Sequence, residues 1–219
     1  NGAVRPERAH RFDIGLSQKL GPNLTLGVDA YYKDVRDLLD FGQFGNALIF
    51  TPFNYRQGKV YGVEFSGNWR DERWLVYANL AVSRSAARDI RSAQYTFEAD
   101  ELAYIANKWI RTDHDQLFTG SAGAVLNAWD GGRVSTSMLY GSGLRRGFAN
   151  TEKLAPYATV NLGVQQDFTG PDRGIWTARL DVLNLFDTAY QLRDGSGIGV
   201  GAPQYGTRRG VFAGLSRAF

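Results

Sequence analysis

The chain has 219 residues, enough for one sizeable domain or two small ones. It contains no cysteine, which excludes disulfide bonds, thiolate zinc sites, iron–sulfur clusters and cysteine nucleophiles. Its 25 basic and 22 acidic residues give a net charge of only +3, so the composition does not indicate a nucleic-acid-binding protein. Apolar runs stop at about five residues, far below the ~20 of a membrane-spanning helix, whereas transmembrane strands would fit because alternation keeps their hydropathy low.

A period of two residues dominates the chain and predicts long amphipathic strands. Apolar and polar side chains alternate over nine segments, at residues 12–20, 24–33, 61–69, 74–83, 118–127, 134–140, 158–168, 176–182 and 211–219. Most of these segments have about ten residues, whereas strands of soluble proteins average ~5–6. The 26 glycines, 11 tyrosines and 13 phenylalanines also favour tightly turning β structure over helices.

The predicted connections alternate in length. Tight turns at residues 21–23, 71–73, 130–132 and 170–173 alternate with long links at 36–57, 85–112, 143–154 and 188–206, and only residues 98–107 resemble a helical insertion. Outer-membrane barrels have short periplasmic turns and long extracellular loops. The pattern therefore predicts an all-β, antiparallel transmembrane β-barrel with its C-terminus on the short-turn, periplasmic side.

The number of strands indicates that the chain is a fragment. Bacterial single-chain barrels use an even number of strands, and nine would leave an unpaired edge in the lipid. We therefore expect further strands on the N-terminal side.

Several short motifs resemble those of TonB-dependent outer-membrane receptors. They are Val4-Arg5-Pro6-Glu7 before a strand, Gly62-Val63-Glu64 within one, Asp113-His114-Asp115-Gln116 with Thr119 at a strand start, Tyr140-Gly141-Ser142-Gly143 at a strand end, Asn184-Leu185-Phe186-Asp187 with Tyr190, and a terminal strand that ends at Phe219. In this order and spacing they cover nearly the whole chain.

The resemblance implies that residues 1–219 are the C-terminal portion of a twenty-two-stranded receptor barrel in the outer membrane of a Gram-negative cell, without the plug domain and signal peptide. It implies a transporter, not an enzyme, that takes up a scarce nutrient such as an iron–siderophore-type complex. The implied partners are the TonB complex, reached through the missing N-terminal plug region, the barrel-assembly machinery, outer-membrane lipids and lipopolysaccharide, and the small-molecule nutrient. It implies no nucleic acid, no cofactor and no metal of its own.

The resemblance also suggests a role for the last strand. Phe219 occupies the position of a terminal aromatic that the barrel-assembly machinery reads, and Val211, Ala213 and Leu215 precede it on one predicted face. Arg217 departs from the family, which usually has an apolar or aromatic residue there. An arginine near a membrane interface costs only ~0–1 kcal/mol, because its guanidinium reaches the headgroups.

Two arginine pairs are candidate contacts for an extracellular ligand or for lipopolysaccharide. Arg145-Arg146 and Arg208-Arg209 lie at predicted strand–loop junctions on the outer side, where paired guanidiniums attract anions. Ordinary solvated charge at the barrel rim is the simpler interpretation.

Two further patterns have simple structural explanations. Asp113-His114-Asp115 contains metal-ligand residue types, but a polar strand start explains it more simply. Residues 197–202 fit a G-x-G-x-x-A nucleotide motif, yet they do not lead from a strand into a helix, so a glycine-rich loop is preferred.

Two alternatives to the receptor stay open from the residues alone. A passive porin shares the architecture but lacks a plug. A secreted carbohydrate-binding β-sandwich would turn the same apolar side chains inward, because alternation does not reveal which face meets water.

Overall fold

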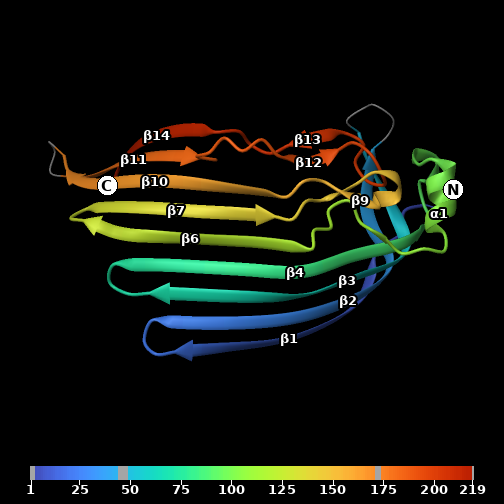
Figure 1. The fold of residues 1–219 in the computed structure, drawn as a ribbon, viewed down its shortest axis with the longest axis horizontal. Helices are drawn as coiled ribbons and strands as arrows, with labels where there is room; N and C mark the ends of the chain where they lie inside the picture. The colour runs from blue at the N-terminus through green and yellow to red at the C-terminus, as the bar shows by residue number, and fades with distance from the viewer. Residues whose placement is uncertain (1–2, 44–48, 171–173, 219) are drawn as a thin grey trace.

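The computed structural model describes residues 3–43, 49–170 and 174–218. Nine long strands form one curved antiparallel sheet, in which each pairs with the next long strand along the chain (Figure 1). They are β1 (Arg8–Leu20), β2 (Leu24–Gln43), β3 (Phe50–Arg70), β4 (Trp74–Ile90), β6 (Phe118–Trp129), β7 (Gly132–Gly141), β10 (Tyr157–Thr169), β11 (Ile175–Leu183) and β14 (Gly210–Arg217). The short strand β5 (Ile110–Arg111) pairs with β4. The predicted all-β class with about nine strands is confirmed.

The two ends of the sheet differ, as predicted. Short turns and the C-terminus lie at one end (Figure 1); of the predicted turn 170–173, residues 171–173 lie outside the described part of the chain. The other end, which we call the head, comprises residues 34–43, 49–59, 84–117, 142–156 and 184–209. It contains α1 (Ala99–Ile105), the 3-10 helices η1 (Gln94–Thr96) and η2 (Phe148–Asn150), and the small hairpins β8 (Arg145–Arg146) with β9 (Glu152–Lys153) and β12 (Gln191–Asp194) with β13 (Pro203–Tyr205). Helix α1 confirms the predicted insertion at 98–107.

The predicted long link at residues 36–57 is mostly strand, which corrects the sequence interpretation. Strand β2 continues to Gln43 and β3 already begins at Phe50. The period of two fails here because Asp37 (φ 54°) and Asp89 (φ 56°) have left-handed backbone and interrupt the pairing on both sides of β3. Beyond that point three consecutive residues, 53–55, are buried, so the hairpin is held by packing inside the head.

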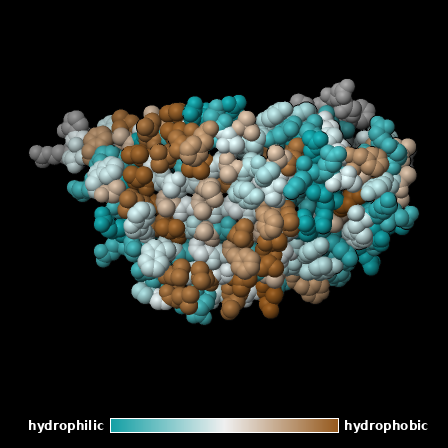
Figure 2. Space-filling model, viewed as in Figure 1, coloured by the Kyte–Doolittle hydropathy of each residue, from teal (hydrophilic) through white to brown (hydrophobic). Residues whose placement is uncertain are grey.

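Antiparallel register assigns the side chains to two faces. One row across the sheet joins Ala30, Val63, Val82 and Phe118, and parallel rows place Leu80, Leu162 and Leu180 on the same apolar face. The opposite face holds the complementary set Asp29, Glu64, Asn79, Asn161 and Asp181. Figure 2 shows the apolar face as a broad brown band flanked by hydrophilic surface on both sides. The separation of apolar and polar side chains that the alternation predicts is therefore confirmed by the register.

Aromatic residues border the apolar band at both ends. Near the short turns the register places Trp69, Trp74, Trp129, Phe168 and Trp176 on the apolar face. Near the head, Tyr32 stacks against Tyr61 with ring centroids 6.3 Å apart. Tyr61 and Trp69 are eight residues apart in β3, or about 26 Å along the strand, which at the ~35–45° tilt of barrel strands covers roughly 20 Å of the ~25 Å apolar band of outer-membrane barrels. Tyr31, the neighbour of Tyr32, is not part of this belt, because its position in the alternation turns it to the polar face.

Glycines on the polar face make room for larger neighbours. At Gly123 an added Cβ would lie 2.5 Å from the ring of Tyr77, the residue opposite it in β4. The tyrosine ring therefore lies over the bare backbone of β6, and the polar face stays close-packed without a branched side chain there.

The buried apolar core lies in the head rather than in the sheet. Its members are Val35, Leu38, Phe53, Tyr55, Ala87, Ile90, Ala93, Ile105, Ile110, Ala149 and Ile198. Apolar side chains of the band are exposed instead, with Ile14 reaching 77% and Leu180 48%. No helix among the described residues is long and apolar enough to cross a membrane. Edge strands β1 and β14 do not pair with each other within the described ranges.

Candidate functional site

The Asp-His-Asp motif lies in the head, where it forms an ion pair with the distant Arg193 and lies close to the buried carboxyl of Asp40. Asp113 is buried; its Oδ1 shares a 2.9 Å hydrogen bond with His114 Nδ1, and its Oδ2 lies 3.1 Å from Arg193 Nε. Ligand atoms of Asp40, Asp113 and His114 lie within 4.8 Å of one another. Asp115 turns away from the cluster, toward the backbone N–H of Ser85 at 2.6 Å.

The electrostatics of this cluster indicate a structural role, in which it holds segments of the head together. Burial raises the pKa of Asp40 to about 6. Burial alone would raise the pKa of Asp113 too, but the hydrogen bond with His114 and the charge of Arg193 lower it overall. Two carboxylates and an imidazole are a donor set that suits zinc-like ions. However, both oxygens of Asp113 are already engaged, so the cluster primarily fastens β12 to the segment between β5 and β6.

The glycine-rich loop covers this cluster. The backbone N–H of Val200 lies 3.5 Å from Asp113 Oδ2, and Ile198 is fully buried. The Asn150 amide holds the loop by donating to the carbonyl of Ile198 at 2.8 Å and accepting from its N–H at 3.0 Å. The loop is thus packed by side chains and backbone of the head, as expected for a loop rather than for a nucleotide site.

The Asn-Leu-Phe-Asp motif builds the turn after β11. Buried Asn184 donates to the carbonyls of Thr188 and Thr207 and accepts from the N–H of Thr188, each at 2.9 Å. Asp187 accepts a bidentate pair from Arg208, at 2.8 and 2.5 Å, and the N–H of Arg209 at 3.0 Å. These charge-assisted bonds lower the pKa of Asp187. The motif ties β11 to the start of β14.

The candidate arginine pairs lie in different surroundings. Arg208 is engaged by Asp187 in the turn just described. Arg146 pairs with Glu152 at 3.1 Å and Asp194 at 3.5 Å. Arg145 instead donates to the backbone carbonyls of residues 150 and 151, at 3.2 and 3.4 Å.

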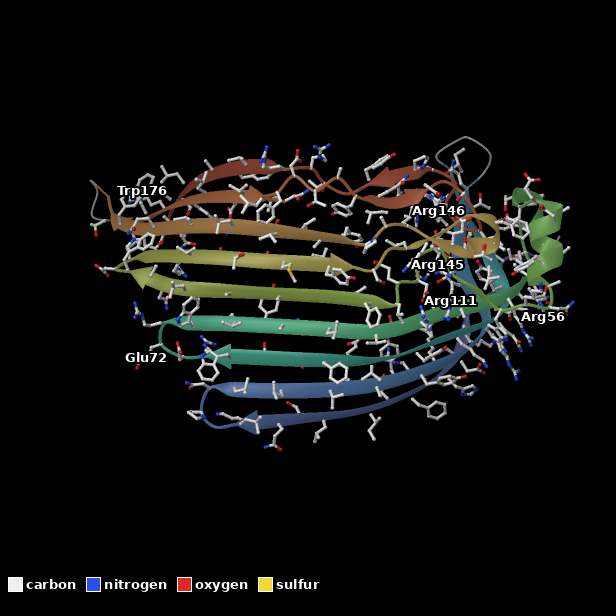
Figure 3. The ribbon with its side chains drawn as sticks, in the orientation of Figure 1. Arg56, Glu72, Arg111, Arg145, Arg146 and Trp176 are labelled. Carbon is white, nitrogen blue, oxygen red and sulfur yellow. The ribbon has the colours of Figure 1, made fainter. Side chains whose placement is uncertain are left out.

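The structure brings Arg145 together with basic residues that lie far from it in the sequence. It lines one cavity with Lys59 and Arg111, and Figure 3 shows Arg111 and Arg145 close together beside the strands of the wall. Lys59 and Arg111 come from β3 and β5. These two strands approach residue 145 only through the pairing of strands in the sheet, and this pairing cannot be read from the sequence.

The last strand continues the apolar face. Val211, Ala213 and Leu215 lie opposite Val182, Leu180 and Ala178 of β11 and share their face. Phe219, the candidate assembly signal, lies outside the described residues.

The fold and its surfaces define a class of protein. A single curved sheet of long strands, apolar on one face, with aromatic belts at both ends of that face, and polar on the other face, is part of the wall of a transmembrane β-barrel.

Comparisons with known proteins give the family. Residues 1–185 match the family described as "TonB dependent receptor-like, beta-barrel". The chain is 24% identical over 119 residues to the vitamin B12 transporter BtuB of Vibrio vulnificus (strain YJ016), an alignment that covers 48% of this chain and 19% of that protein. The chain belongs to this family of outer-membrane proteins.

Solved structures agree with the family assignment. The ferric preacinetobactin receptor BauA from Acinetobacter baumannii matches with a TM-score of 0.69 and 15% identity over 95% of this chain and 29% of that one. The ferric-catecholate import receptor Fiu from E. coli K12, in its closed form, matches with a TM-score of 0.64 and 18% identity over 97% and 27%. The chain therefore spans about a fifth of the curated relative and less than a third of these receptors.

Proposed function

We propose that the chain forms the C-terminal part of the barrel of an outer-membrane receptor that imports a scarce nutrient, an iron–siderophore-type complex, with energy supplied through TonB. The observation that carries the proposal is a membrane-thick wall with one polar face, in a chain of the TonB-dependent receptor family. Two relatives named above are receptors for ferric complexes and one is a vitamin transporter, which supports a bulky, scarce cargo.

The geometry supports a lumen on the polar side. Side chains such as Asp29, Glu64 and Asp181 would be costly in hydrocarbon, so their face belongs next to water. A bulky complex that passes a plugged lumen needs an energy input. The structured head lies over one mouth of this wall, where an arriving nutrient would first meet the protein.

Uptake in cells with and without TonB tests the import proposal. The full-length receptor should transport a radiolabelled ferric siderophore in TonB-positive cells, and uptake should fall to the background of receptor-deleted cells when TonB is absent. Surface binding of the same siderophore should persist without TonB, which serves as a control for receptor expression. Unchanged uptake without TonB would favour the passive porin instead.

We also propose that β1 and β14 are edges that further strands of the same barrel cover, and that the C-terminus is periplasmic. Both edges expose unpaired backbone groups, which the bilayer does not tolerate. A secreted β-sandwich lacks support, because it needs two large sheets packed face to face, whereas the described residues form one large sheet and two small hairpins.

Cysteine labelling tests which face meets water. These 219 residues contain no cysteine, so single cysteines can be introduced without background from this part of the barrel. In the intact receptor, cysteines at Asp29, Glu64, Asn79, Asn161 and Asp181 should react with a membrane-impermeant maleimide. Cysteines at Ala30, Val63, Leu80, Leu162 and Leu180 should react only after detergent denaturation. Equal labelling of both sets in the folded receptor would refute the orientation.

A further inference from the structure

The cluster of Asp40, Asp113 and His114 has features of a binding site, beginning with the carboxyl of Asp40. Asp40 is buried, with an exposed fraction of 9%. Its Oδ1 accepts the N–H of Phe41 at 2.8 Å, whereas its Oδ2 has no hydrogen-bond partner among the described residues. A buried carboxylate oxygen without a partner is costly unless a ligand from outside the protein satisfies it.

The charges in the cluster indicate that this ligand is a cation. The ligand oxygen of Asp40 lies within 4.8 Å of the ligand atoms of Asp113 and His114, and two carboxylates this close repel each other. The Arg193 guanidinium pairs with Asp113 at 3.1 Å, so it directly neutralises only one of the two carboxylates. A positive ion between them would offset the remaining charge.

A second buried polar group lies beside Asp40. The register pairs Asp40 with Phe53 and Leu38 with Tyr55, so Asp40 and Tyr55 are diagonal neighbours on one face of the β2–β3 hairpin. The Tyr55 side chain is fully buried, and its hydroxyl has no hydrogen-bond partner in the described part of the chain. Polar atoms in this region are therefore available to an ion and to a water molecule bound to it.

The distances suit a small ion with tetrahedral coordination. Zinc bonds of about 2.0–2.1 Å separate neighbouring ligand atoms by about 3.3 Å. Asp113 Oδ1 and His114 Nδ1 are 2.9 Å apart and share a hydrogen bond, whose proton would pass to water when the ion takes its place. The widest pair of the three ligand atoms is within 4.8 Å, so a shift of the Asp40 carboxyl by about 1.5 Å closes the site.

The contacts that already engage Asp113 and His114 resemble those of bound metal ligands, which are normally held by further hydrogen bonds. Arg193 lies against Asp113 Oδ2, which leaves Oδ1 for the ion. His114 Nε2 lies 3.3 Å from the hydroxyl of buried Thr112, so a proton on Nε2 directs the lone pair of Nδ1 toward the ion. Arg193 and Thr112 are therefore positioning residues of this site.

The glycine-rich loop closes one side of the cluster, and His114 leaves the other side open. An added Cβ at Gly199 would lie 2.6 Å from Asp113 Cγ, so the loop backbone approaches this closely only with glycine. The His114 side chain is 53% exposed, which gives an ion a route from solvent. An ion bound here would connect β2 with the segment between β5 and β6 and, through Arg193, with β12.

We propose that Asp40, Asp113 and His114 bind an exchangeable divalent transition-metal ion such as Zn²⁺, with water as the fourth ligand, and that the ion stiffens the glycine-rich loop. The resemblance to the receptor family does not imply such a site. Three protein ligands with one side open suit an exchangeable ion, since purely structural zinc sites use four. Calcium and magnesium prefer six or more oxygen ligands, so an imidazole in a three-residue set disfavours both.

Zinc titration of the full-length receptor in detergent, after removal of metals with EDTA, tests the site by calorimetry. His114→Gln and Asp40→Asn should each bind one zinc ion fewer than the wild type. His10→Gln is the matched control, because His10 is the other histidine of these 219 residues and is exposed on β1; it should keep the ion. Arg193→Gln should keep the ion but bind it about 10- to 100-fold more weakly, as expected for a positioning residue.

Hydrogen exchange provides a readout that needs no substitution. Zinc should slow amide exchange of residues 195–201 in the wild type, whereas calcium at the same concentration should not. Heat-modifiable gel migration shows whether each variant is folded.

Three results would overturn the proposal. They are equal zinc binding by the folded variants and the wild type, loss of an ion in His114→Gln alone, which would mean a surface histidine only, and exchange of the loop that zinc leaves unchanged. Zinc binding does not depend on TonB, so a failure of the import proposal would leave these results unchanged and can be recognised separately.

Discussion

Replacing Asn184 by alanine should destabilise the receptor strongly, because one buried amide satisfies three backbone groups. Its side chain makes three hydrogen bonds of 2.9 Å, to the N–H and carbonyl of Thr188 and to the carbonyl of Thr207. Alanine would leave these groups without partners in a buried site, at about 1 kcal/mol for each bond. Asn184 also has a φ of 47°, and an alanine in left-handed backbone costs about 1 kcal/mol more. The expected loss is therefore about 4 kcal/mol.

Urea unfolding of the intact receptor in detergent micelles, followed by tryptophan fluorescence, measures this loss. Asn184→Gly removes the same hydrogen bonds but accepts the left-handed backbone, so it should recover about 1 kcal/mol relative to alanine. Asn127→Ala is the matched control, since Asn127 is exposed and its amide donates to the carbonyl of Glu72 at 3.1 Å; it should change stability by less than about 0.5 kcal/mol. An Asn184→Ala receptor with the unfolding midpoint of the wild type would refute the assignment of this turn as a point of attachment.

Two further predictions concern titration and assembly. The Asp40 carboxyl, whose pKa burial raises to about 6 from 3.8, binds its proton more tightly when folded, so its contribution to stability is full below pH 4 and is lost as the pH rises through 6. Asp40→Asn should remove this loss of about 3 kcal/mol, which unfolding curves between pH 4 and pH 7 would reveal as a flatter profile. For Phe219, we propose a role as assembly signal: deleting it should cause unfolded chains to accumulate in the periplasm while refolded receptor keeps its unfolding midpoint. A lowered midpoint with normal insertion would mean that Phe219 is only an interfacial anchor.

The wall of the barrel could be predicted from the sequence because it depends on the local alternation of apolar and polar side chains. Each side chain of the band meets lipid or water according to its parity in one strand, so alternation alone assigns Val63 to one face and Glu64 to the other. The belt residues Trp69 and Trp74 were predictable for the same reason. Tyr31 shows that nearness to a strand end is not enough: it adjoins Tyr32 of the belt, yet its parity turns it to the polar face.

The head could not be predicted in the same way, because its order depends on contacts between distant segments. Asp40, Asp113 and Arg193 meet in one cluster, yet they come from β2, the start of β6 and β12. The Asp-His-Asp motif marked Asp113 and its neighbour His114, but nothing local marks Asp40 or Arg193. The arginine pairs show the same limit, since adjacent residues Arg145 and Arg146 turn toward different partners.

The wall and the head therefore obtain their stability in different surroundings. Apolar residues of the wall face lipid, whereas residues of the head pack against one another next to water. Band residues such as Leu180 remain 48% exposed in the protein itself and obtain their hydrophobic burial from lipid. Head residues such as Tyr55 and Ile105 are fully buried against one another on the aqueous side. Substitutions in the band should change insertion and lipid contact, whereas substitutions in the head should change the shape of the surface that we propose a nutrient meets first. A cavity of about 390 Å³ lies where wall and head meet, and it is lined by Tyr61 of the belt and Tyr104 of the head, so its shape depends on residues of both kinds.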